Sequence, residues 1–240
     1  MAQEPPTAQE RPTLQPWHTV ELKEEFRASD AARIRTLAQY QALETRLFAE
    51  LDQRIYQAVD PRERSKINRY WAGSNSDPRT SNPDWSRTQV MPVANPRGAV
   101  LLVHGLSDSP YIMRGLAQYL HGQGWYVVAL RLPGHGTAPS GLLDVKWQDW
   151  AAALRMAAKD LSAIVGNDKT GNGKPLVLAG FSTGGALVME YALAQRQGEA
   201  LPKPSNVLLF SPAIGPAAHP GLPDGRGCHG IHRGCGQGAV

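Results

Sequence analysis

The pattern of apolar and polar positions divides the chain into a polar first part and a regular second part. Residues 1–28 are rich in Pro, Gln and Glu, and we expect them to be disordered. Between residues 29 and 59 apolar side chains recur at four-residue spacing, which predicts an amphipathic helix. This stripe contains Leu43, Leu47, Leu51 and Ile55. Residues 60–87 are polar, with frequent Asn, Ser, Asp and Pro, and they predict a linker.

From residue 88 onward, apolar runs of strand length alternate with segments of helical periodicity. Four continuous apolar runs predict buried strands, at 98–105, 125–132, 175–180 and 205–212. A shorter run, TQVMPVA, predicts an edge strand that Pro92 interrupts. Helical spacing predicts helices at 109–124, 146–165 and 183–197. Residues 88–215 therefore predict an α/β domain with a doubly wound, mostly parallel sheet and an N-terminal helical extension.

Residues 216–240 differ from the rest because they are rich in glycine and show no apolar periodicity. We expect an irregular tail. Zinc-ligand types occur there as Cys228, His229, His232 and Cys235, but two adjacent ligands fit one tetrahedral ion poorly. The abrupt change near Gly215 favours an interrupted reading frame over a metal site. We expect no metal and no cofactor.

Composition narrows the function classes. The chain is 42% hydrophobic and 19% charged, with a net charge of +4, which is typical of a soluble globular protein. Its basic residues are scattered and not interleaved with aromatic ones, so we expect no nucleic-acid partner. No apolar run reaches the length of about 18 residues that a membrane span needs. The first residues lack the apolar core of a secretory signal, and we expect a cytoplasmic protein.

The stretch GFSTG, residues 180–184, carries the strongest chemical signal. Ser182 lies between a predicted buried strand and a predicted helix, with a glycine on either side at Gly180 and Gly184. A serine nucleophile needs so sharp a turn, and the N-terminus of the following helix stabilises an oxyanion. An incidental serine in a glycine-rich turn is the alternative. A phosphate-binding turn is another, but no Gly-Lys-Ser/Thr follows.

The stretch LLVHGLSDSP, residues 101–110, supplies a second element. Acyl transfer needs two backbone N–H groups directed at one oxygen. One is the amide after the nucleophile, Thr183, and the other comes from the loop after an earlier strand, where Leu106 stands. His104 lies at the strand end, and we expect it to brace the loop rather than transfer protons.

These motifs together resemble the α/β-hydrolase superfamily. The stretches VLLVHGLSDSP, LPGHGT, DVKWQDW and GFSTGG are most similar to its carboxylesterase and monoacylglycerol lipase branch, often grouped with serine aminopeptidase S33-type domains. The match covers about residues 88–215. It implies hydrolysis of short acyl esters or monoglycerides by a Ser–Asp–His triad without metal, with the nucleophile at Ser182 and the oxyanion amides at Leu106 and Thr183. It also places His135 in a loop near the site, outside the triad.

The sequence departs from this family pattern after residue 215. The triad acid and base should follow Ser182 on loops after later strands. The glycine-rich tail offers Asp224, His219, His229 and His232, and we expect this coil not to hold a base rigidly against the serine. The sequence thus predicts a C-terminally truncated, incomplete sheet, an unpaired edge at Val207–Phe210 and impaired hydrolysis.

Alternative functions follow from the same features. The chain is either a serine hydrolase with a small ester or lipid substrate, or a non-catalytic remnant acting in binding or assembly. A peptidase or acyltransferase of the same fold is a third option. Copies of the chain could associate through residues 29–59 or through the exposed sheet edge.

Overall fold

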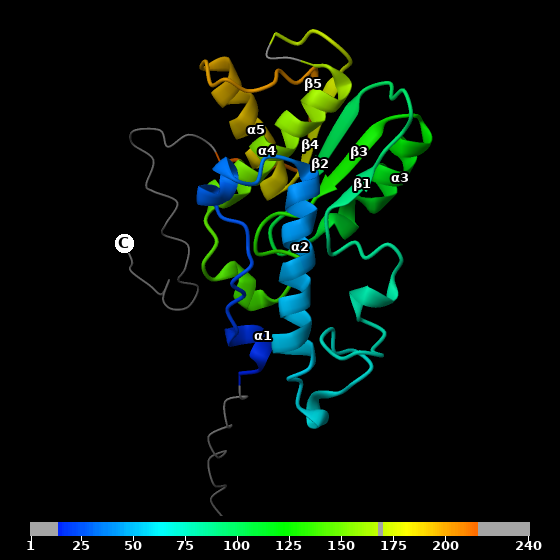
Figure 1. Cartoon of the computed structure of the whole chain (residues 1–240), viewed down its shortest axis with the longest axis vertical. Helices are drawn as coiled ribbons and strands as arrows, with labels where there is room; N and C mark the ends of the chain where they lie inside the picture. The colour runs from blue at the N-terminus through cyan, green and yellow to red at the C-terminus, as the bar shows by residue number, and fades with distance from the viewer. Residues whose placement is uncertain (1–13, 168–169, 216–240) are drawn as a thin grey trace, which may run out of the picture.

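The computed structural model describes residues 14–167 and 170–215, which contain a five-stranded sheet with helices on both faces (Figure 1). The strands are β1 (Gln89–Met91), β2 (Ala99–Val103), β3 (Tyr126–Leu130), β4 (Leu176–Phe181) and β5 (Asn206–Phe210). Their order is β1-β3-β2-β4-β5. β1 runs antiparallel to β3, and all other neighbours are parallel. The predicted α/β fold with a mostly parallel sheet is confirmed.

The described residues contain five α-helices and several shorter turns. The helices are α1 (Pro16–Thr19), α2 (Leu37–Leu51), α3 (Arg114–Gly122), α4 (Trp147–Val165) and α5 (Thr183–Arg196). Of these, α1 and α2 precede the first strand, and α3, α4 and α5 lie between strands. 3₁₀ turns lie at Ala28–Ala32, Pro61–Glu63, Pro78–Thr80, Pro110–Met113 and Pro139–Leu142, and a π-helical turn at Asp52–Tyr56. In the described part of the chain, no helix combines the length and apolar character that crossing a bilayer requires.

The central strand β2 shows how the two layers of helices are held. Its five residues are all buried, and alternate side chains point to opposite faces. Leu101 and Val103 pack with residues of α4 and α5, whereas Val100 and Leu102 pack with residues of α3. A continuous apolar strand is therefore required here, because both faces of the sheet are covered (Figure 1).

The segment predicted as one helix over 29–59 consists of three pieces. A 3₁₀ turn precedes α2, and a π-helical turn follows it. α2 begins late because Thr36 caps it, its side chain accepting a hydrogen bond from the Gln39 N–H at 3.2 Å. The apolar stripe predicted from the sequence is buried within the chain at Leu43, Leu47, Leu51 and Ile55.

The structure differs from the predicted disorder over residues 1–28, since residues 14–28 pack on the domain. Leu22 and Phe26 are buried, and Phe26 contacts Tyr40 of α2 edge-to-face at 5.3 Å. Trp17 stacks on the ring of Tyr70 at 5.0 Å. The few apolar residues of this polar segment therefore pack against α2 and other parts of the chain.

Residues 60–87 form a chain of turns that packs against the domain rather than spanning open space. Asp60 and Asp77 cap short 3₁₀ turns, each accepting a hydrogen bond from a backbone N–H two residues on. Tyr70 and Trp85 are buried and anchor the segment. Its polar composition therefore reflects capped turns. Together with residues 14–59 it extends beyond one end of the sheet (Figure 1).

Candidate active site

Ser182 lies at a sharp turn between β4 and α5. Its backbone dihedral angles are φ 52° and ψ −118°, a conformation that a residue with a Cβ rarely adopts. Its N–H donates to the carbonyl of Phe210 at 2.9 Å, and its own carbonyl accepts from the Ala213 N–H at 3.0 Å. The end of β5 thus holds the strained turn on both sides. This arrangement presents the serine at the carboxyl edge of the sheet.

The two glycines of the motif are required by close backbone contacts. A Cβ at Gly180 would lie 2.3 Å from the carbonyl oxygen of Gly184. A Cβ at Gly184 would lie 2.4 Å from the carbonyl oxygens of Val103 and His104. A side chain at Gly180 would push the end of β4 away from the start of α5, and a side chain at Gly184 would push the turn away from β2. The spacing of the glycines around Ser182 therefore follows from the geometry of the turn.

The loop after β2 lies directly against the serine. A Cβ at Gly105 would be 3.2 Å from Ser182 Cβ, so this glycine permits the close approach. Leu106 follows on the same loop and is 54% exposed. Thr183 is the first residue of α5. Within residues 14–167 and 170–215, the backbone N–H groups of Leu106 and Thr183 donate no hydrogen bond, and Ser182 Oγ has no partner.

His104 is held in place and kept neutral. Its Nδ1 bonds to the carbonyl of Gly105 at 2.8 Å, and its Nε2 accepts from the Leu132 N–H at 3.0 Å. Because a carbonyl only accepts and an amide N–H only donates, Nδ1 carries the proton. Burial, with a smaller contribution from His135, lowers the pKa of His104 to about 3. His104 therefore joins the β2 loop to the end of β3, as a bracing residue would.

His135 is the second buried histidine near this edge. Its Nδ1 donates to the carbonyl of Pro133 at 2.9 Å, and Trp150 Nε1 donates to the same oxygen at 2.9 Å. Its ring packs edge-to-face against His104 at 4.9 Å and against Trp150 at 5.4 Å. Burial lowers the pKa of His135, so the ring is neutral. Its Nε2 has no partner among the described residues.

Arg131, directly after β3, is fully buried between two carboxylates. Its Nη2 lies 2.9 Å from Glu25 Oε1, and its Nε lies 2.8 Å from Glu44 Oε1. Burial alone would lower the pKa of Arg131, but the neighbouring Glu25, Tyr40 and Glu44 hold it well above its ordinary value. Such a pair is costly to desolvate, and removing one partner is strongly destabilising.

This cluster ties the N-terminal segment to the loop that carries His135. Arg131 Nη1 donates to the His135 carbonyl at 3.1 Å, and Glu25 Oε2 accepts from the Gly134 N–H at 2.8 Å. The cluster was not predicted from the sequence. The only signal was a set of charged residues, Glu25, Glu44 and Arg131, placed among apolar neighbours in distant segments.

A cavity of about 560 Å³ lies beside this loop. Its wall is formed by side chains from residues 69–86, 107–111 and 134–142. The second and third segments follow β2 and β3, so the cavity opens at the same carboxyl edge of the sheet as Ser182. The cavity was not predicted from the sequence, because its first segment has the polar composition of a linker.

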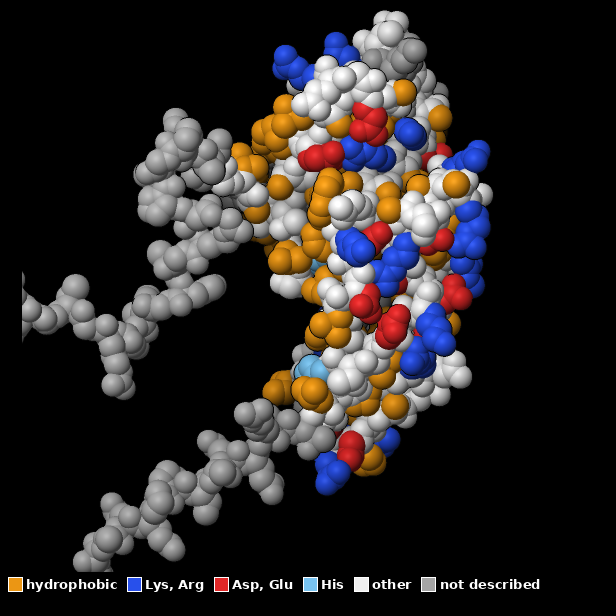
Figure 2. Space-filling view, turned by 90° about the vertical axis from the view of Figure 1, so that its left-hand side faces the viewer, with side chains coloured by type: hydrophobic (Ala, Val, Ile, Leu, Met, Phe, Trp, Pro, Cys, Tyr) orange, Lys and Arg blue, Asp and Glu red, His pale blue; other side chains and the backbone are white. Residues whose placement is uncertain are grey.

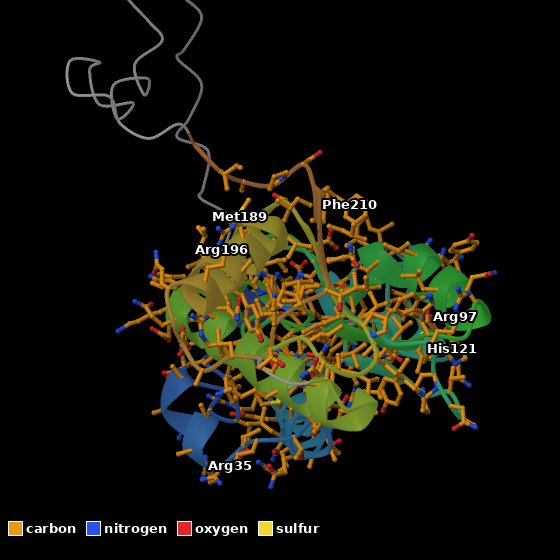
Figure 3. All side chains as sticks on the ribbon, turned by 90° about the horizontal axis from the view of Figure 1, so that it is seen from above. Arg35, Arg97, His121, Met189, Arg196 and Phe210 are labelled. Carbon is orange, nitrogen blue, oxygen red and sulfur yellow. The ribbon has the colours of Figure 1, made fainter. Side chains whose placement is uncertain are left out.

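The edge strand β5 is half covered. Leu208 and Phe210 are 43% and 42% exposed, and within the described residues β5 pairs with β4 alone. Figure 3 shows Phe210 at the margin of the sheet, on the side of Met189 and Arg196 of α5. The other residues weighed for the triad or for zinc, Asp224, His219, His229, His232, Cys228 and Cys235, lie outside the described residues.

Surface charge does not gather into one patch on the face that Figure 2 shows, where basic and acidic side chains are interspersed. Several side chains of opposite charge form ion pairs in the described part of the chain. Arg155 pairs with Glu190 at 2.6 Å and with Glu199 at 2.9 Å, and Arg54 pairs with Glu50 at 2.9 Å. No group of three or more metal-ligating side chains occurs in the part of the chain that the structure describes.

Comparison with known proteins gives a family and several relatives. The model of a family described as serine aminopeptidase, S33, matches residues 94–228. The thermostable monoacylglycerol lipase of Bacillus sp. (strain H-257) is 40% identical over 55 residues, which cover 23% of this chain and 22% of that lipase.

Solved structures of lipolytic enzymes are also similar. A structure reported for the metagenome-derived lipolytic enzymes LipS and LipT is 27% identical, with a TM-score of 0.43, and covers 53% of this chain and 46% of that one. The Paleococcus ferrophilus monoacylglycerol lipase is 27% identical, with a TM-score of 0.41, over 57% of this chain and 46% of that one. The chain spans less than half the length of these relatives.

Proposed function

The chain belongs to the serine aminopeptidase S33 family, and on this premise we propose that it is a serine hydrolase that cleaves carboxylic esters through Ser182. The observation that carries the proposal is the strained backbone of Ser182, at φ 52°, between a buried strand and a helix. Strain of this kind persists only where the surrounding structure holds it, and it is common at catalytic residues. The glycine contacts and the bonds to β5 supply that support.

The proposed reaction proceeds through an acyl-enzyme. Ser182 Oγ attacks the ester carbonyl carbon while a base takes its proton, and the carbonyl oxygen becomes an oxyanion. The N–H groups of Leu106 and Thr183 donate to this oxygen, and the N-terminus of α5 adds favourable electrostatics. The C–O bond to the alcohol then breaks, and the alcohol leaves with a proton. Water cleaves the acyl-enzyme, which releases the carboxylic acid and restores the serine.

Neither buried histidine suits the role of base. Both ring nitrogens of His104 are engaged, and the pKa of His104 is lowered to about 3. His135 bonds to the Pro133 carbonyl through Nδ1, and its Nε2 has no partner among the described residues, so no hydrogen bond joins His135 to Ser182. We therefore assign the role of base to no described residue. Because the triad acid and base are missing from the described part of the chain, we propose that hydrolysis is impaired, with turnover lower by about 10⁴ to 10⁶ than with an intact triad.

Short acyl esters and monoglycerides are the proposed substrates. The similarity to proteins named as monoacylglycerol lipases supports this choice. A test is the hydrolysis of p-nitrophenyl butyrate by the purified full chain. We expect a rate above buffer that is lost in Ser182→Ala and kept in Ser65→Ala, since Ser65 is exposed and far from the turn in sequence. Equal rates for both variants would contradict the proposal.

A peptidase is the second candidate, because the matched family is described as an aminopeptidase. Amino acid p-nitroanilides distinguish the two functions. The ester proposal predicts faster turnover of p-nitrophenyl butyrate than of any p-nitroanilide. If both substrates give the buffer rate, the alternative of a non-catalytic binding protein is favoured.

A further inference from the structure

The cavity of about 560 Å³ at the carboxyl edge of the sheet has no role in the reaction described so far. Much of its wall comes from residues 69–86, which precede the region matched by the family model. Its side chains are rich in hydroxyl groups, contributed by Ser76, Thr80, Ser86, Ser107, Ser109 and Thr137. Thr80, Ser107 and Thr137 already donate their hydroxyl protons to backbone carbonyls, so their oxygens remain as acceptors. Such a wall can accept hydrogen bonds from the hydroxyls of a ligand, and the volume of the cavity is that of an ordinary small-molecule site.

One buried acceptor in this wall is unused. His135 is 2% exposed and lines the cavity, and its Nδ1 donates to Pro133. The proton on Nδ1 leaves Nε2 with a bare lone pair, and Nε2 has no partner among the described residues. Buried polar atoms in proteins nearly always have a hydrogen-bond partner. Because Nε2 is itself buried, a hydroxyl donor on a ligand would supply one once the adjoining wall of the cavity moves aside.

The charged groups of the cavity are already engaged. Arg69 Nη2 donates to Ser86 Oγ at 3.1 Å and to the Gly136 carbonyl at 3.0 Å. Asp77 pairs with Arg79 at 2.8 Å, and Asp108 Oδ1 accepts from the backbone N–H that follows it, also at 2.8 Å. When Arg79, the partner of Asp77, is counted, two cations stand against two carboxylates, so the cavity attracts neither an anion nor a cation strongly. The ligand that fits is neutral.

Aromatic side chains complete the wall. Trp85 is buried, and Tyr111 is half exposed at the rim of the cavity. The flat faces of such rings pack well against the C–H groups of a saturated ring or a carbon chain that bears hydroxyls. From this wall, its unused acceptor and its balanced charge, we propose that the cavity binds a neutral polyhydroxylated group of polyol or sugar type.

Binding can be tested without turnover in the full-length Ser182→Ala variant. Saturation-transfer NMR with glycerol and methyl β-glucoside should show transfer to both, and none to propan-1-ol or inorganic phosphate. Adding Ser76→Trp fills the cavity from an exposed lining position and should weaken polyol binding at least about tenfold. Ser65→Trp, on the same segment but outside the lining, should leave it unchanged. No transfer to either polyol, or equal binding by the two tryptophan variants, overturns the proposal.

The acceptor is tested by His135→Phe, which keeps a ring between His104 and Trp150 but removes Nε2. We expect polyol binding to fall at least about tenfold in protein whose thermal unfolding remains cooperative. Polyol binding of undiminished strength in folded His135→Phe contradicts the role of this nitrogen. If His135→Phe does not fold, the comparison of Ser76→Trp with Ser65→Trp tests whether the cavity binds the polyol.

The polyhydroxylated group has two sources, the alcohol part of an ester substrate or a free polyol. The first rests on the proposed function and predicts that Ser76→Trp lowers kcat/KM for glyceryl monobutyrate at least about tenfold while leaving butyl butyrate unchanged. The second predicts lost polyol binding with both esters unaffected. A wild-type chain that hydrolyses neither ester refutes the proposed hydrolase, while the binding result with Ser182→Ala stands by itself.

Discussion

The turn at Ser182 and the neighbouring cavity are built in opposite ways. The turn is encoded by five consecutive residues, and its glycines are required because an added Cβ would lie only 2.3 to 2.4 Å from nearby backbone atoms. The cavity needs three segments that are distant in sequence, and one of them belongs to the N-terminal part of the chain. The turn at Ser182 therefore depends mostly on local geometry, whereas the adjoining pocket depends on long-range anchoring.

The long-range anchor is Arg131, and breaking it should have the largest effect. Arg131→Met leaves Glu25 and Glu44 buried without their cation, which should lower the free energy of unfolding by about 3–5 kcal/mol. Chemical denaturation measures this loss. Arg155→Met is the matched control, because its partners Glu190 and Glu199 are partly exposed and the expected loss is about 0–1 kcal/mol. Equal losses for the two variants would show that burial of the Arg131 cluster does not matter.

Gly184→Ala tests whether the turn at Ser182 requires the close approach of its backbone to β2. The added methyl meets the carbonyl oxygens of Val103 and His104 at 2.4 Å, so β2 and the turn must move apart. We expect a loss of about 3 kcal/mol in unfolding free energy and loss of ester hydrolysis. Gly115→Ala in α3 is the control, since nothing lies within 4 Å of its added Cβ, and it should be neutral or slightly stabilising. Full activity in Gly184→Ala contradicts the geometric requirement.

The sequence was sufficient for the local features because their signals are local. Continuous apolar runs place β2, β3, β4 and β5 within two residues of their observed bounds, and the strand–turn–helix context places Ser182. The Arg131 cluster could not be found this way. Its partners Glu25 and Glu44 are separated from it by 106 and 87 residues, and no periodic pattern links them.

The same reason explains the error over residues 14–28. Composition alone predicted disorder there, but Phe26 and Leu22 are buried by surfaces that only the folded chain provides. The two buried histidines differ in how far their roles could be predicted from the sequence. His104 could be predicted as a bracing residue from its place at a strand end, whereas the unused Nε2 of His135 became visible only with its surroundings.

The dependence of stability on pH tests the buried, neutral state of His104, which lies at the start of the loop after β2. His104 stays neutral in the folded chain down to about pH 3, whereas in the unfolded chain it binds a proton below its ordinary pKa. Protons therefore bind preferentially to the unfolded state, and stability falls as the pH drops. Between pH 7 and pH 5 this histidine should account for a loss of about 2 kcal/mol.

The measurement is the difference in unfolding free energy between the two pH values for wild type and His104→Phe. The variant should lose less stability than wild type on acidification. His18→Gln serves as the control because His18 is exposed, and it should follow wild type. An unchanged pH dependence in His104→Phe would show that His104 is not held neutral.

The smallest effect is expected at the edge strand. Phe210 is 42% exposed on β5, so Phe210→Lys should change the unfolding free energy by about 0.5 kcal/mol or less. A charge on an edge strand opposes pairing with another copy. Sedimentation velocity at high protein concentration should therefore show less self-association in Phe210→Lys than in wild type. Greater association in the variant would contradict a role for this edge.

We propose that Ser182 is a reactive nucleophile. Treatment of the intact chain with a fluorophosphonate, followed by tandem mass spectrometry, locates the covalent adduct directly. We expect one adduct, on Ser182 Oγ, that is absent from Ser182→Ala. An adduct on any other serine, or none on Ser182 in folded protein, would show that Ser182 is not the nucleophile.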